Sequence, residues 1–146
     1  MKNDKISILV ALLFAACSPP DCESKNGFKL YGIESFPQWS CEYFDHLERR
    51  FTFVAQSCVA CGVDSGIGRG WAVDLVGKSR WIDSYGRDID GSTECETRVI
   101  LVGVAKNESP RDSSFVHEAF HAADNCTDHE RWKERGIYQA IEAAKL

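Results

Sequence analysis

Several features that mark other protein classes are missing from this 146-residue chain. After residue 16 it has no apolar run long enough to cross a membrane, and it has no internal repeat or low-complexity segment. Basic residues do not predominate, because 17 Lys and Arg stand against 22 Asp and Glu, for a net charge of −5. This balance argues against a nucleic-acid partner. The remaining length and composition predict one globular domain with a real core.

One apolar run does occur, and it lies near the start of the chain. Lys2 and Lys5 precede it, and it extends from Ile6 to Ala16 with only Ser7 as an interruption. As a helix it would cover about 16 Å, roughly half of a bilayer's hydrocarbon core. Residues 1–16 are therefore predicted to be a signal peptide, and the protein is predicted to be exported.

The end of the apolar run has the sequence LFAAC, from Leu13 to Cys17. This segment resembles the lipobox of bacterial lipoproteins, with Phe14 where leucine is usual. The resemblance implies cleavage before Cys17 and lipidation of that cysteine, so that residues 17–27 would tether the domain to a membrane of the bacterial cell envelope. The alternative is an ordinary exported protein in which Cys17 carries no lipid.

The other cysteines are even in number, which suits a chain that leaves the reducing cytosol. They are Cys22, Cys41, Cys58, Cys61, Cys95 and Cys126. Three disulfides are expected, although the sequence cannot choose among their 15 connectivities. Two alternatives stay open: a redox pair formed by Cys58 and Cys61, and a four-cysteine zinc site that includes Cys95 and Cys126.

Hydrophobic periodicity predicts an α+β domain over residues 28–146, with a small twisted sheet, an N-terminal helix, a buried metal-binding helix and a C-terminal helix. The predicted helices cover 40–50, 112–123 (capped by Asp112 or Ser113) and 128–144. The predicted strands cover 51–55, 71–76 and 99–104, with a further short strand starting at 81. The 99–104 strand is expected to be buried on both faces.

The most informative motif is His117-Glu118-Ala119-Phe120-His121, within the apolar helix. Residues four apart lie on one side of a helix, so both imidazoles can reach one metal ion. Glu118 lies beside them, where it is poorly placed as a ligand but well placed to take a proton from a water molecule. The alternative is that both histidines are hydrogen-bonded core residues and Glu118 is a solvated helix residue.

A catalytic zinc site normally has three protein ligands, so a third must come from downstream. In an unbroken helix His129 would lie about 12 Å beyond His121, which predicts that the helix breaks first. The segment 124–128 has turn composition, and Thr127 with Glu130 forms a capping box that would place His129 in the first turn of a second helix. His129 is therefore the first choice for the third metal ligand. The alternatives are Asp124, Glu130, Glu134 and Glu142, with Asp124 equally suited to orienting an imidazole.

The segment from Thr97 to Leu146 resembles the zincin metallopeptidases, in which a strand precedes a buried helix with this motif. The resemblance implies that His117 and His121 bind zinc and that Glu118 is the catalytic base. The metzincin extension is absent, because Asp124 and Thr127 occupy its glycine and third-ligand positions. The chain is also similar to small exported lipoproteins that carry this motif near the C-terminus.

These observations predict an exported, lipid-anchored zinc metallopeptidase that hydrolyses peptide or protein substrates with a zinc-activated water. The 99–104 strand could align an extended peptide, and Tyr138, Arg131 or Arg135 could stabilise the oxyanion. The alternative is a non-catalytic, disulfide-stapled lipoprotein that acts as a binding or envelope protein, with a structural metal or none.

Overall fold

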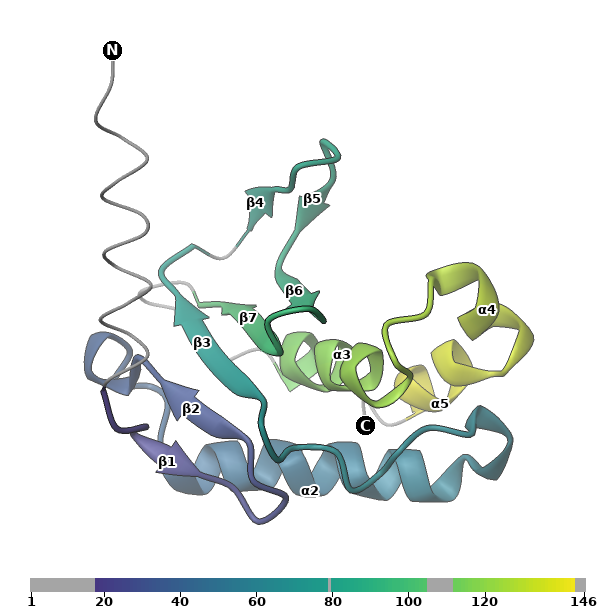
Figure 1. The fold of residues 1–146 in the computed structure, drawn as a ribbon, viewed down its shortest axis with the longest axis horizontal. Coiled ribbons are helices and arrows are strands. Elements are labelled where there is room, and N and C mark those ends of the chain that lie inside the picture. Colours follow the sequence, from purple (N-terminus) through teal and green to yellow (C-terminus); the bar gives the residue numbers. More distant parts are fainter. Residues whose placement is uncertain (1–17, 79, 105–111, 144–146) are drawn as a thin grey trace.

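The computed structural model describes residues 18–78, 80–104 and 112–143. They form a mixed α+β fold in which helices pack against a small sheet (Figure 1). The expected signal peptide and Cys17 lie outside these residues. None of the helices within them has the length and apolarity needed to span a membrane.

The main sheet has five strands in the order β1-β2-β3-β7-β6. β2, β3 and β7 run parallel, whereas β1 and β6 pair antiparallel to them at the two edges. β4 (Trp81–Ile82) and β5 (Asp88–Ile89) form a separate hairpin that stands away from this sheet (Figure 1). The five strands are β1 (Cys22–Glu23), β2 (Lys29–Tyr31), β3 (Ala72–Val76), β6 (Gly91–Glu94) and β7 (Val99–Gly103).

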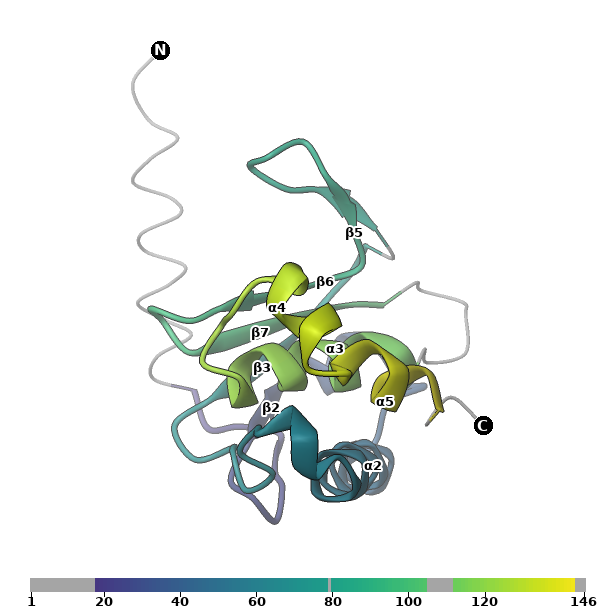
Figure 2. The same cartoon turned by 90° about the vertical axis from the view of Figure 1, so that its right-hand side faces the viewer.

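The longest helices are α2 (Cys41–Ser57) and α3 (Asp112–Ala123). α3 contacts β6 and β7 of the sheet and also α2, and it lies between α2 and α4 (Figure 2). The short helices are η1 (Ile33–Ser35), η2 (Val59–Cys61), α4 (His129–Glu134) and α5 (Ile137–Ala143). The predicted metal-binding helix therefore packs within the core of the fold.

The predicted strand at 51–55 is wrong, because α2 continues through it to Ser57. Phe44, Leu47, Phe51 and Val54 are all buried, and their spacing follows one face of a single helix. Phe53 shares the alternating apolar pattern but lies on the outer face, where 70% of it is exposed. The helical stripe prevailed because it buries Phe51 against Phe120, with ring centroids 5.2 Å apart.

The predicted strands at 71–76 and 99–104 correspond to β3 and β7. The prediction that β7 is buried on both faces is wrong, since Ile100 and Val102 are buried while the alternate residues Val99, Leu101 and Gly103 are only half-buried. The buried face of β7 packs toward the core that contains α3. One covered face thus accounts for Ile100 and Val102 but not for the apolar Val99 and Leu101.

Three disulfides join the six cysteines that follow residue 17, as predicted. Cys22 pairs with Cys41, Cys58 with Cys61, and Cys95 with Cys126. Cys95 and Cys126 are bonded to each other, which contradicts a four-cysteine zinc site. The first bridge also shows that the chain joins the fold at Cys22, inside the segment 17–27 that was expected to be a tether.

The predicted C-terminal helix over 128–144 is wrong in two respects. It is divided into α4 and α5 at Gly136, whose φ of 71° is a left-handed conformation that favours glycine. Asp128 rather than Thr127 caps α4, since its carboxylate accepts the backbone N–H of Arg131 at 3.1 Å. The Thr127 hydroxyl donates to Asp124 instead.

Candidate metal centre

Helix α3 presents His117 and His121 on one side, with ring centroids 5.1 Å apart. The opposite side of the helix is anchored by Phe115, whose ring packs edge-on against Phe28 and Phe44. This anchoring fixes the rotation of α3 about its axis. Both imidazoles are consequently held at the boundary between core and solvent, where each is half-buried.

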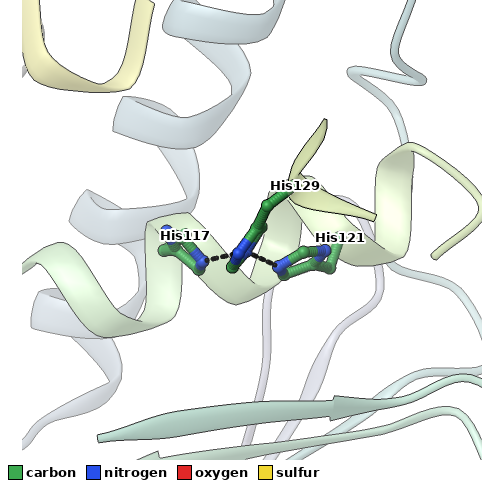
Figure 3. A group of neighbouring side chains, drawn as sticks. All are labelled: His117, His121 and His129. Atoms are coloured by element: carbon green, nitrogen blue, oxygen red, sulfur yellow. Dashed lines mark hydrogen bonds between the residues drawn. The ribbon is translucent and has the colours of Figure 1, made fainter. Parts of the chain in front are cut away.

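The chain reverses direction after α3 and brings His129 back over it. Asn125 and Cys126 both have positive φ values, of 54° and 57°, and the Cys126 N–H donates to the carbonyl of His121 at 2.8 Å. The Cys95–Cys126 disulfide ties this turn to the connection between β6 and β7. As the first residue of α4, His129 then faces the two histidines of α3 (Figure 3).

The three imidazoles meet through their Nε2 atoms. His129 Nε2 lies 3.2 Å from His117 Nε2 and 2.8 Å from His121 Nε2, and each histidine offers a nitrogen within 4.8 Å of the others. Tetrahedral zinc with Zn–N bonds of about 2.0–2.1 Å sets neighbouring ligand nitrogens about 3.3 Å apart. The spacing therefore fits a metal ion.

No carboxylate joins this cluster among the described residues. Of the alternatives to His129, Asp124 is buried and accepts hydrogen bonds from other residues, including Trp132. Glu130 is exposed and forms an ion pair with Lys133. Neither Glu134 nor Glu142 belongs to the cluster either. His129 is thus the third residue that the fold brings to the two histidines.

The environment favours neutral imidazoles, which are the form that binds metals. Burial lowers the pKa of His121 to about 3, and the neighbouring His117 and His129 act in the same direction. Burial also lowers the pKa of His129. At physiological pH the rings of His121 and His129 are therefore mostly uncharged.

A buried network behind His121 holds its ring in place. The indole of Trp132 stacks on this imidazole and donates its Nε1–H to Asp124 at 3.0 Å. The same carboxylate accepts from the Thr127 hydroxyl and from the guanidinium of Arg135, which also donates to the Cys61 carbonyl. Asp124 is therefore a support that acts through Trp132. The sequence analysis did not predict that Trp132 would support the His121 ring.

Glu118 lies on α3 beside the histidines but outside their cluster. It is only 7% exposed, and burial raises the pKa of its carboxyl group to about 7. The Thr93 hydroxyl on β6 lies 2.8 Å from Glu118 Oε2, a hydrogen bond that acts against this rise in pKa. A carboxyl group with a pKa near neutrality can both accept and return a proton.

A cavity of about 710 Å³ opens onto the histidines and Glu118. This volume is within the range of small-molecule and peptide side-chain sites. Its walls come from the end of the β4–β5 hairpin, from β6 and from the helices α3, α4 and α5. The wall formed by β5 and β6 was not predicted, because those strands are short and polar.

The three oxyanion candidates occupy different environments. Tyr138 lines the cavity with its ring centroid 5.4 Å from that of His129, and burial raises the pKa of its phenol. Arg135 is bound to Asp124 and to a backbone carbonyl, and Arg131 is exposed outside the cavity wall. Tyr138 alone of the three therefore faces the site.

The prediction that the 99–104 strand aligns a peptide is wrong. β7 lies inside the sheet, where β3 pairs with one side of it and β6 with the other. Its backbone N–H and C=O groups are therefore not available to a further strand. β6 is at the edge of the sheet and lines the cavity instead.

Comparison of the chain with models of protein families, with curated proteins and with solved structures gave no match. The resemblance to zincins therefore rests on the sequence motif that contains His117, Glu118 and His121.

Proposed function

We propose that this protein is a zincin-like zinc metallopeptidase that is exported and anchored to a membrane of the bacterial cell envelope by lipidated Cys17. The observation that carries the proposal is the convergence of three Nε2 atoms beside a buried glutamate in an open cavity. Three protein ligands with space for another are typical of catalytic zinc, whereas structural zinc usually has four protein ligands.

His117, His121 and His129 would hold the metal through neutral imidazole nitrogens, a ligand type that suits Zn²⁺. The bound ion would supply a lowered pKa for a water molecule and polarisation of a substrate carbonyl. The cavity fits this use, because it leaves one side of the histidine cluster open to a substrate.

Glu118 acts as the general base in this proposal. Its carboxylate takes a proton from the attacking water and then delivers it to the nitrogen of the leaving amine. The raised pKa, about 7, supports both halves of this proton transfer. Tyr138 donates a hydrogen bond from its phenolic hydroxyl to the carbonyl oxygen as negative charge develops there.

The substrate would bind as an extended peptide along β6. This strand is the last in the sheet order, and its residues Gly91, Ser92 and Thr93 line the cavity. A peptide can add to such an edge through main-chain hydrogen bonds, which makes affinity largely independent of the substrate's side chains. We therefore expect broad cleavage rather than recognition of one sequence.

Export is supported by the three disulfides, which form and persist outside the reducing cytosol. The fold includes Cys22, five residues after the proposed lipid attachment site. Few residues would then separate the domain from the membrane, so substrates would be peptides or proteins near that surface.

The decisive experiment is to incubate the zinc-loaded protein with a broad peptide library and identify products by mass spectrometry. Wild type should cleave peptides, and Glu118→Gln should retain zinc but hydrolyse at least about 100-fold more slowly. Glu42→Gln, at an exposed position on α2, is the matched control and should match wild type.

The alternative is a non-catalytic binding or envelope protein with a structural metal. It would be favoured if zinc-loaded wild type cleaved nothing in the library. Retention of zinc by both wild type and Glu118→Gln would not separate the two functions, so turnover is the measurement that matters.

A further inference from the structure

We propose that β6 contains two positioning residues for Glu118: Thr93, through its hydroxyl group, and Gly91, through its lack of a side chain. The catalytic meaning of this inference rests on the proposed function. The contact itself is a property of the fold and can be tested separately.

The Thr93 hydroxyl reaches two oxygen atoms of the same glutamate. Its Oγ1 lies 2.8 Å from the carboxylate atom Oε2 and 2.9 Å from the backbone carbonyl oxygen of Glu118. A hydroxyl has one hydrogen to donate and lone pairs with which to accept. One hydroxyl group on β6 thus contacts both the side chain and the backbone of Glu118.

This arrangement suits a general base, whose carboxyl group must keep a fixed position relative to the attacking water. The hydrogen bond from the Thr93 hydroxyl to Oε2 holds the carboxyl group in one orientation beside the cavity. The backbone contact adds to this, because it also links the turn of α3 that carries Glu118 to β6.

Gly91 leaves the space that the glutamate side chain occupies. A Cβ atom at this position would lie 2.8 Å from Glu118 Cγ and 2.9 Å from Oε1, which is closer than non-bonded atoms approach. The φ of Gly91 is not in the left-handed region. The need for glycine here therefore comes from Glu118 and not from the backbone.

The strand that carries both residues is itself well fixed. Gly91 and Thr93 are two apart, so they lie on one face of β6, which is the face that contacts α3. They pair with Val102 and Ile100, two buried residues of β7. β6 therefore holds the carboxyl group against a rigid sheet.

The kinetic test compares variants of Thr93 in the zinc-loaded protein. Thr93→Val keeps the shape but removes the hydroxyl, and it should lower kcat about 10- to 100-fold while KM and zinc content stay within about two-fold of wild type. Thr93→Ser restores the hydroxyl and should recover most of kcat. Thr97→Val, in the turn between β6 and β7, is the matched control.

Gly91→Ala should produce the same loss of kcat with zinc retained. Its control is Gly77→Ala, because a Cβ there would meet only Phe36 at an ordinary distance of 3.5 Å. If Thr93→Val kept the wild-type kcat, or if Thr93→Ser were as slow as Thr93→Val, the inference would be overturned.

A second measurement does not depend on peptidase activity. Thr93→Val, Glu118→Ala and the double variant are unfolded with denaturant in the zinc-free protein, which gives a double-mutant cycle. The shifts in midpoint should be non-additive, because each single change already breaks the same contact. Additive shifts would overturn the inference. An inactive wild type with non-additive shifts would instead overturn the proposed function and leave the contact established.

Discussion

The indole ring of Trp132 stacks on the imidazole of His121, with ring centroids 4.0 Å apart and ring planes 26° from parallel. Trp132 is fully buried and donates a hydrogen bond to Asp124, so it gives the His121 ring a fixed surface to pack against. A ligand that is already oriented loses little conformational freedom on binding a metal. The candidate site is therefore organised by the fold itself.

The three histidines should be required for stoichiometric zinc. Replacing His117, His121 or His129 with alanine leaves two protein ligands at a site that needs three. Zinc measured by mass spectrometry after dialysis should fall from one ion per chain to near none. His46→Ala is the matched control, since His46 is exposed on α2, and it should keep its zinc. Retention of zinc by His129→Ala would contradict the assignment of that ligand.

Asp124→Asn should weaken zinc binding by about 10- to 100-fold, a smaller loss than removal of a ligand. The amide cannot replace the charged acceptor for Trp132 and Arg135, so the support of His121 becomes looser. Competition with a chelator of known affinity measures the change. Asp45→Asn on α2 serves as the control. An unchanged affinity would show that the network supports only folding.

The Cys95–Cys126 disulfide should contribute more stability than the Cys58–Cys61 disulfide. The first spans 31 positions and the second spans 3. Loss of the first therefore raises the conformational entropy of the unfolded chain by much more than loss of the second. Replacing both cysteines with serine should lower the free energy of unfolding by about 3–4 kcal/mol for the first pair and about 2 kcal/mol for the second. Guanidinium unfolding of the zinc-free proteins measures both. Equal losses would argue against this connectivity or this entropic origin.

Cys17→Ser should release the protein from membranes into the soluble exported fraction. The substitution removes the proposed lipid attachment site, whereas the apolar segment before it still directs export. Fractionation of cells that express each form, followed by immunoblotting, provides the measurement. A wild-type protein that is already fully soluble after export would rule out the anchor.

Local patterns were sufficient to predict much of the fold. The helix with His117 and His121 is predicted by a capping residue, Asp112 or Ser113, and the largely apolar stretch that follows it. β7 is a continuous apolar run, and β3 is an apolar run that only Asp74 interrupts. The choice of His129 followed from the turn composition after Ala123. In each case the physical cause lies within a few neighbouring residues, which is why it can be seen in the sequence.

Predictions failed where two local patterns competed or where the cause was distant. Residues 51–55 alternate like a strand, but burial of Phe51 against Phe120 favours a helix. Thr127 has the spacing of a cap, yet Asp124 holds its hydroxyl and Asp128 caps α4. Propensity alone could not decide either case.

The sequence by itself determined which groups are available: two imidazoles and a carboxyl group on one helix, a third imidazole after a turn, and six cysteines for three bridges. Only the tertiary structure decided how they are held. It set the disulfide pairing, placed Thr93 and Gly91 against Glu118 from 25 and 27 positions away, and stacked Trp132 on His121. These contacts depend on how helices and sheet pack in three dimensions, and packing is specified by the whole core and not by any short segment.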